Sequence, residues 1–312
     1  MDELEKSILK TVVWFDMFNF PLTLDEIYDL RFKIYELKTD DLDKILANLV
    51  NKNILQQKQG FYFLSGRDEL VEVRHERHEE SLRKVKRAKK AVKFLSLLPH
   101  VKAVIVCNVL GYLNAKSEDD IDFLIITSAK RIWLARFFAT GFFKLLNLRP
   151  RPGKIADQFC FSFYVTEDAL NLEKIKLEDD PYFIWWFMGL LPIFDDDNYF
   201  ERFLRANAWV NKFLPGFEHY YKDYKDKERD IKKFQVKGVF SLLKHLMEAA
   251  SLDFDEKVYK KIQLKIMPRL LKDKMNKSDG VKINDKILKF HVDDRRREFA
   301  KEFKERLFFL SS

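Results

Sequence analysis

The chain has 312 residues, a hydrophobic content of 47% and a formal net charge of +8, which together exclude a disordered protein and predict about two domains. Only 9 glycines and 8 prolines interrupt it, so we expect a helix-rich chain. The basic balance favours an acidic partner such as nucleic acid, a nucleotide or an anionic membrane, although a basic charge kept for solubility explains it equally well.

Residues 1–75 predict a small N-terminal domain of three helices followed by a β-hairpin. Thr23 and Glu26 form a capping box that starts the second helix, and Thr39 starts the third. Two short apolar runs separated by Gln59-Gly60 then read as the hairpin. Three helices and a hairpin are typical of a winged helix.

The third of these helices argues against DNA binding, although winged helices often bind DNA. Its leading end carries Asp40, Asp41 and Asp43. In the groove of a duplex these carboxylates would face phosphates and repel them. We therefore expect the N-terminal domain to have a structural or protein-contact role.

Residues 76–98 predict one long linker helix that ends before Pro99. An apolar stripe covers one side, and basic residues, Lys84 among them, cover the rest, with no acidic residue from 81 to 98. Such a face could follow a nucleic-acid backbone, with Lys86, Lys89 and Lys90 as contacts. A solvated linker helix explains the same pattern equally well.

Two apolar runs, Val101–Cys107 and Ile121–Thr127, are each short enough to be a buried strand. Asp120 and Asp122 are two residues apart at the head of the second run, and side chains at i and i+2 of a strand point to the same side. Adjacent carboxylates repel unless a cation lies between them, and Mg²⁺ takes such oxygens together with substrate phosphates. The pattern indicates a metal-dependent site for phosphate chemistry; a solvated strand end is the alternative.

A helix and a third strand follow. Arg136 is a cation in an otherwise apolar helix, so it pairs with the acidic cluster, contacts a phosphate or extends to solvent. The basic loop 149–154 could contact a triphosphate or an acceptor, or be a simple turn. Asp157 opens the apolar run QFCFSFYVT, which predicts the strand.

The two longest apolar stretches, Ile132–Leu148 and Phe183–Phe194, are too short to span a membrane and are interpreted as buried helices. Cys107 and Cys160 lie inside strand-like runs, which suits buried thiols in a reducing cytosol. No Cys/His spacing typical of zinc occurs. We expect a cytoplasmic protein without a membrane partner.

The C-terminal part is predicted to be mainly helical. Trp185 and Trp186 belong to an aromatic helix and read as core residues, residues 220–233 read as an exposed connection, and residues 281–290 read as a short hairpin before a last helix. The predicted domains are therefore 1–75, a linker helix at 76–98, a catalytic-type core at 99–175 and a helical domain at 176–312.

The strand–turn–strand segment with D-I-D at the head of its second strand resembles the nucleotidyltransferase superfamily, the fold of polymerase β. The downstream segments IWLARFF, QFCFSFYVT and DDPYFIWWFMGLLPIFD resemble a bacterial subgroup of nucleotidyltransferase-like proteins, whose members begin with a winged-helix segment similar to FDMFNFPLTLDEI. The resemblance implies an α+β fold with a mixed-sheet core between the winged helix and the helical C-terminal region.

The resemblance also implies a reaction: a nucleoside monophosphate moves from a nucleoside triphosphate, with ATP expected, to an acceptor hydroxyl on RNA, protein or a small molecule. Asp120 and Asp122 would hold two Mg²⁺ ions. Asp157 would be the third ligand or the general base. The turn formed by Asn108, Val109 and Gly111 would hold the phosphates through backbone N–H groups. Arg136 would contact the nucleotide.

One departure supports a different reading. The superfamily usually has Gly-Ser at the end of the first strand, where this chain has Asn108-Val109. Without the serine hydroxyl, either backbone N–H groups alone bind the phosphates or the site is impaired. The alternative function is a catalytically impaired binding or regulatory protein on the same fold, with nucleic acid bound by the basic helix 81–93.

Overall fold

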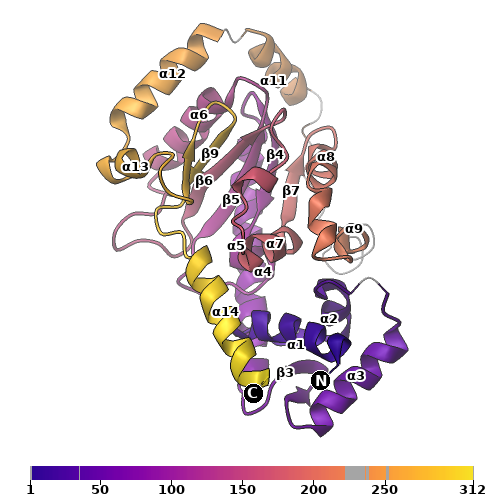
Figure 1. The fold of residues 1–312 in the computed structure, drawn as a ribbon. Helices are drawn as coiled ribbons and strands as arrows, with labels where there is room; N and C mark the ends of the chain where they lie inside the picture. Colours follow the sequence, from indigo (N-terminus) through magenta and orange to yellow (C-terminus); the bar gives the residue numbers. More distant parts are fainter. Residues whose placement is uncertain (1, 35, 222–235, 237–238, 251–252, 312) are drawn as a thin grey trace.

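The computed structural model describes residues 2–34, 36–221, 236, 239–250 and 253–311, and the protein it shows is of the α+β class (Figure 1). An N-terminal unit is built on a small three-stranded sheet, and a larger unit is built on a mixed six-stranded sheet. A mixed α+β fold is what the sequence predicted.

The N-terminal unit contains the predicted three helices and hairpin, together with one further short strand. Its elements are α1 (Glu3–Asp16), β1 (Leu22–Thr23), α2 (Leu24–Leu30), α3 (Thr39–Asn51), β2 (Leu55–Lys58) and β3 (Phe61–Leu64). The strands pair antiparallel in the order β1-β3-β2. The capping box is confirmed, because the Glu26 amide donates to the Thr23 hydroxyl at 3.2 Å and the Thr23 amide donates to the Glu26 carboxylate at 3.0 Å.

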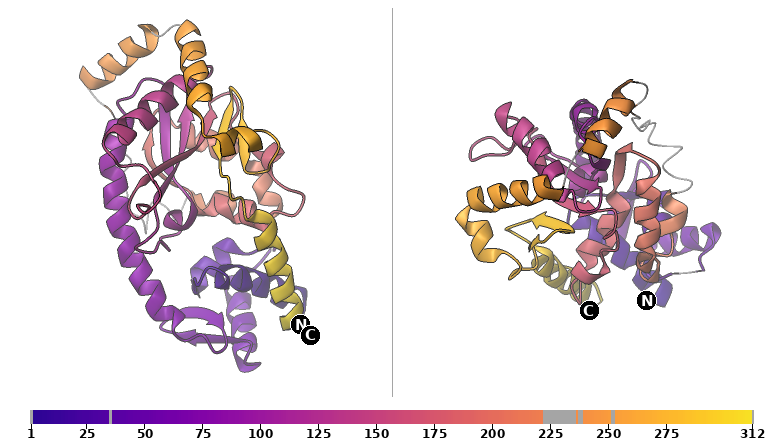
Figure 2. Two further views of the ribbon diagram at one scale, coloured as in Figure 1. Left: turned by 90° about the vertical axis from the view of Figure 1, so that its left-hand side faces the viewer. Right: turned by 90° about the horizontal axis from the view of Figure 1, so that it is seen from above.

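One helix, α4 (Leu70–Leu95), runs from the N-terminal unit along the larger one (Figure 2). It begins before the predicted residue 76 because Leu70 and Val71 are buried with Phe63 of the hairpin. The prediction that Lys84 faces solvent was wrong, since this lysine is fully buried. Its ammonium group is satisfied by the loop that precedes the second strand of the large sheet, as described below.

The larger sheet has the strand order β7-β4-β5-β6-β9-β8. Its members are β4 (Val101–Val106), β5 (Ile121–Thr127), β6 (Phe159–Thr166), β7 (Leu191–Asp195), β8 (Val281–Ile283) and β9 (Ile287–Phe290). Strands β5 and β6 are parallel, and every other neighbouring pair is antiparallel. The three strands predicted between residues 101 and 166 are confirmed to within one residue.

The prediction that Phe183–Phe194 is one buried helix was wrong. Helix α7 (Pro181–Trp186) and a 3-10 turn occupy its first half, and β7 occupies its end. A fully buried strand and a buried helix segment give the same continuous apolar run, so periodicity cannot separate them. Pro192 fits β7 because this strand lies at the sheet edge, where a missing N–H is tolerated.

The C-terminal region is also less purely helical than predicted. The predicted hairpin at 281–290 forms, and its strands β8 and β9 extend the large sheet beside β6. The sheet therefore continues beyond residue 175, where the core was expected to end. The predicted exposed connection at 220–233 lies outside the described residues from 222 onward.

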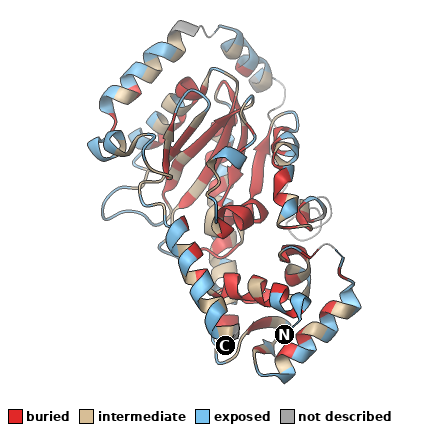
Figure 3. Ribbon diagram, in the orientation of Figure 1, coloured by how far each residue is buried: buried red, intermediate tan, exposed pale blue. Residues whose placement is uncertain are grey.

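Helices cover both faces of the large sheet, and its strands are largely buried (Figure 3). Helices α4, α6 (Ile132–Leu145) and α12 (Asp253–Ile266) share one apolar cluster with one face. Helices α1, α7 and α14 (Arg296–Ser311) share a second cluster with the other face. The remaining helices are α5 (Asn108–Gly111), α8 (Tyr199–Ala206), α9 (Phe217–His219), α11 (Val239–Ala250) and α13 (Arg269–Lys274), with 3-10 turns at Glu173–Ile175, Phe187–Gly189 and Ala208–Lys212.

Candidate functional site

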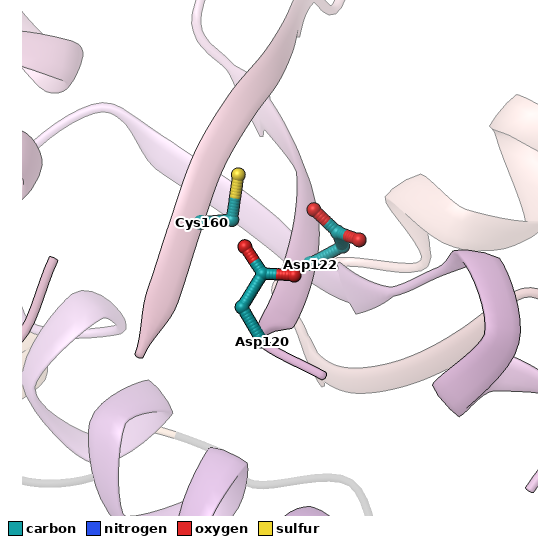
Figure 4. Close-up of side chains that lie close together, drawn as sticks. All are labelled: Asp120, Asp122 and Cys160. Carbon is teal, nitrogen blue, oxygen red and sulfur yellow. The ribbon is translucent and has the colours of Figure 1, made fainter. Parts of the chain in front are cut away.

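Asp120 and Asp122 lie side by side where β5 begins. Asp122 pairs across the parallel ladder with Cys160 of β6. One carboxylate oxygen of each aspartate and the Cys160 sulfur all lie within 4.8 Å of one another, and Figure 4 shows the three side chains gathered at one point of the sheet. Ile121 and Phe123 are fully buried on the opposite face. The predicted i, i+2 arrangement of the two acids is thus present.

The environment of the pair opposes its negative charge. Burial, followed by the neighbouring Asp122 charge, raises the pKa of Asp120 to about 7. Burial also raises the pKa of Asp122, although hydrogen bonds from Asn108 and Cys160 act the other way. Within the described ranges, no basic side chain forms an ion pair with either carboxylate. Two carboxylates in such surroundings repel each other unless a proton or a cation lies between them.

Asn108 connects the acidic pair to an aromatic wall. Its side-chain amide donates to Asp122 Oδ2 at 2.7 Å, and its amide oxygen accepts from the Trp186 indole at 3.0 Å. Asn108 has φ of +57°, a left-handed conformation that asparagine tolerates better than most residues. Asn108 therefore holds an acidic side chain in place.

Gly111 was predicted to belong to a phosphate-binding turn together with Val109. In the structure Gly111 lies where α5 touches the 3-10 turn of Gly189, and a Cβ added at Gly111 would lie 1.6 Å from the Gly189 carbonyl oxygen. Close approach of two backbones accounts for this glycine. Val109 is half-buried beside Asn108.

Asp157 was predicted as the third acid, but its carboxylate is held by α4. Oδ1 accepts from Arg83 at 2.6 Å and from Lys84 at 2.9 Å. Burial alone would raise the pKa of Asp157, but these hydrogen bonds outweigh it and lower the pKa to about 2. Asp157 does not belong to the cluster with Asp120 and Asp122, so the geometry gives it a structural contact. Cys160 is the β6 residue that faces the pair.

Burial keeps the Cys160 thiol protonated, because it raises the pKa of this group well above its usual value. The sequence placed Cys160 deeper in the strand than Asp157 but could not show that it stands next to Asp122. That adjacency depends on the parallel register of β5 and β6. One feature of the sequence could have indicated this adjacency. Cys160 is the second residue of its strand, and Asp122 is the second residue of the neighbouring strand.

Arg136 lies on α6, against the sheet face opposite the acidic pair, so the structure does not bring it to Asp120 and Asp122. Its guanidinium donates to Gln263 Oε1 at 2.5 Å and lies 4.3 Å from the centre of the Phe290 ring. Burial lowers the pKa of Arg136 to about 10.

Two cavities lined by aromatic residues lie near the acidic pair and share some of their lining residues. One lies between α1 and the helices α5 and α7, and the other reaches the start of α14. Counting the space that is open to solvent, their volumes are about 440 Å³ and about 650 Å³. Both are lined by Asn108, Tyr182 and Trp186. The cations of the second cavity are already paired, Lys289 with Asp294 and Arg296 with Asp180 and Asp294.

The three lysines predicted to contact nucleic acid lie along α4. Lys86 and Lys90 are exposed, whereas Lys89 is half-buried. Exposure of this kind is required for a backbone contact but does not demonstrate one. Nucleic-acid binding by these lysines stays a prediction.

Comparison with family models, with curated proteins and with solved structures finds no match for this chain. Along the described part of the chain, no helix is both long enough and apolar enough to cross a bilayer.

Proposed function

We propose that the protein binds a Mg²⁺–nucleoside triphosphate at Asp120 and Asp122 and transfers its nucleoside monophosphate to an acceptor hydroxyl. The observation that carries the proposal is the pair itself: two converging carboxylates, buried enough that the pKa of Asp120 rises to about 7, with no basic partner among the described residues. Two such carboxylates are more stable in their charged form with a divalent cation between them than without one.

The residues present fit Mg²⁺ in part. Two carboxylates are the hard oxygen ligands that Mg²⁺ takes alongside waters and substrate phosphates, whereas the neutral Cys160 thiol is a soft group that it does not favour. Asp120 and Asp122 would hold the ion, which when bound supplies positive charge against the triphosphate oxygens. One ion suits this set of residues better than the two expected from the sequence.

In the proposed reaction the acceptor oxygen forms a bond to the α-phosphorus, the α–β anhydride bond breaks and pyrophosphate leaves. The acceptor proton passes to solvent, because the described cluster offers no third carboxylate to take it. Asn108 orients Asp122 through its amide. Trp186 in turn orients Asn108 and forms part of the aromatic wall.

Calorimetric titration of ATP with Mg²⁺, and again with EDTA, tests the proposal. We expect saturable binding that needs Mg²⁺ and falls at least tenfold in Asp122→Asn. Asp43→Asn, which removes the same charge from an exposed position on α3, should bind as the wild type does. Equal binding by both variants would refute the site.

A second candidate function is nucleotide binding without transfer. It is favoured because the residue of β6 beside the pair is Cys160 and not an acid, and because Asp157 is bound to Arg83 and Lys84. Release of pyrophosphate from ATP separates the two. Release by the wild type that Asp122→Asn abolishes supports transfer; release only after Cys160→Asp supports binding without transfer.

The fold assignment belongs to the same proposal. The order helix, strand, helix, helix, hairpin in residues 3–64 supports a winged helix, and the order of β4, α5, β5, α6 and β6 supports a nucleotidyltransferase-like core. The acidic head of α3, where Asp40 and Asp43 are exposed, supports a bracing role over DNA binding for the N-terminal unit.

A further inference from the structure

Two arginines lie close together on the sheet face opposite the acidic pair, without an acidic partner. Arg136 is on α6, and Arg149 follows that helix in the basic loop; both are half-buried. Neither forms an ion pair with any described residue. Two like charges under the surface are costly unless an anion accompanies them.

Four buried polar groups at this place also lack hydrogen-bond partners. They are Arg136 Nε, Arg149 Nη1, Thr140 Oγ1 and the Tyr164 hydroxyl. Each buried donor without a hydrogen-bond partner costs free energy of folding. The two guanidinium N–H groups can only donate and so need an acceptor, and the two hydroxyls can donate to the same acceptor.

Tyr164 of β6 shows that these groups converge. Its side chain is fully buried, and burial raises the pKa of its hydroxyl. Arg136 and Thr140 are four residues apart on α6 and so share one face of that helix, and the Arg149 guanidinium lies 5.1 Å from the ring centre of Phe161, on the same strand as Tyr164. In agreement with this placement, the charges of both arginines and the Thr140 hydroxyl act to lower the pKa of Tyr164. The two arginines also act on each other, since the Arg149 charge helps burial to lower the pKa of Arg136.

The surrounding residues compensate these charges only in part. Arg136 donates to Gln263 and lies over the Phe290 ring, and Arg149 lies 5.1 Å from the centre of the Phe161 ring. The acids of the neighbouring elements are engaged elsewhere. Glu256 of α12 accepts from the first amides of α6, and Asp285 pairs with Lys260.

We propose that Arg136, Arg149, Thr140 and Tyr164 form a binding site for a phosphate-type oxyanion. Two guanidinium groups and two hydroxyls come from three separate segments, α6, β6 and the basic loop. Several donors of this kind suit a tetrahedral anion with several acceptor oxygens better than a planar carboxylate. Figure 1 labels α6 and β6, two of the elements that carry these side chains. The site lies across the sheet from Asp120 and Asp122, so it does not depend on the proposed function.

Calorimetry with inorganic phosphate, in low-chloride buffer with EDTA, tests the site. We expect saturable binding that weakens at least tenfold in Arg149→Gln and about tenfold in Tyr164→Phe, which loses one donor but keeps the ring. Arg151→Gln is the matched control, since Arg151 is an exposed residue of the same loop and should leave the affinity unchanged. If Arg149→Gln does not fold, Tyr164→Phe decides.

Two results would overturn the proposal. One is a phosphate affinity that is the same in Arg149→Gln and Arg151→Gln, and the other is displacement of phosphate by chloride at the same concentration as phosphate itself. Mg²⁺–ATP binding by the same variants shows whether the phosphoryl group belongs to a separate ligand or to the nucleotide. If Arg149→Gln loses phosphate alone, the ligand is separate from the nucleotide; if it loses both, the phosphoryl group is the nucleotide's. Phosphate binding that persists in Asp122→Asn supports the oxyanion site even where the proposed function fails.

Discussion

At the scale of single residues, the surroundings of Asp120 and Asp122 disfavour the ionised form of both carboxyl groups. The pKa of Asp120 is raised to about 7 by burial and by Asp122, above an ordinary value of 3.8. The folded protein therefore binds this proton more tightly than the unfolded chain does. The stability that Asp120 contributes is present below pH 3.8 and is lost as the pH rises through 7.

The first residue-scale prediction concerns Asp120→Asn. Because the asparagine does not ionise, the variant should gain stability over the wild type as the pH rises from 4 to 8, by on the order of 3 kcal/mol at one pKa unit per about 1.4 kcal/mol. Urea unfolding at both pH values without divalent cations measures the difference. Asp43→Asn should show no such trend, and a constant difference for Asp120→Asn would contradict the raised pKa.

Asp157 shows the opposite residue-scale behaviour. Hydrogen bonds from Arg83 and Lys84 outweigh burial and lower its pKa to about 2. Its contribution to stability is therefore present above pH 3.8 and is lost as the pH falls toward 2. The pKa values of Asp120 and Asp157 are therefore shifted in opposite directions from the ordinary value, because Asp120 is buried beside another acid and Asp157 faces two cations.

At the scale of elements, α4 does more than link two units. The buried Lys84 ammonium donates to the carbonyl oxygens of Ser117 and Asp119 at 3.0 and 2.8 Å, as well as to Asp157. The residue before Asp120 is thereby fixed to the helix. Lys84 therefore contacts the segments that precede both β5 and β6, and Arg83 and Arg87 of the same helix also donate to Asp157.

The element-scale prediction uses two glycines in different surroundings. Gly111→Ala should destabilise the protein by about 3 kcal/mol or more, because the new Cβ would meet the Gly189 backbone at 1.6 Å and a packed backbone cannot yield cheaply. Gly141→Ala, inside α6 with no atom within 4 Å of the new Cβ, should stabilise by about 0.5–1 kcal/mol. Urea midpoints decide, and a similar effect of both changes would contradict the close approach of α5 to the Gly189 turn.

At the scale of the whole molecule, the N-terminal unit is packed onto the larger one by aromatic rings. Trp14 of α1 stacks on Trp185 of α7 with ring centres 5.0 Å apart, and Phe303 of α14 lies 5.3 Å away. The buried carboxylate of Asp16 accepts from Arg67 at 2.7 Å and from Arg306 at 2.9 Å. The two ends of the chain therefore meet in one core.

The whole-molecule prediction is that Trp14→Ala costs about 3–5 kcal/mol and that the wild type unfolds in one transition. Far-UV circular dichroism and tryptophan fluorescence should give coincident urea curves. Leu4→Ala changes an exposed residue of the same helix and should shift the midpoint little. Two separate transitions would show that the N-terminal unit folds on its own.

Local chemistry determined much of this protein from the sequence by itself. The apolar runs of β4 and β5, the capping box at Thr23 and the shared side of Asp120 and Asp122 all follow from spacing within a few residues. Strand period and helix capping are local effects, so the sequence displays them directly.

Only the tertiary structure decided the rest. Cys160 reaches the acidic pair through a parallel register, Lys84 is buried by a loop more than thirty residues away, and β7 joins β4 from a segment that periodicity could not separate from a helix. The pairing of Asp157 with α4 likewise depends on a contact between distant segments. Such contacts are set by the packing of whole elements, which no local pattern encodes.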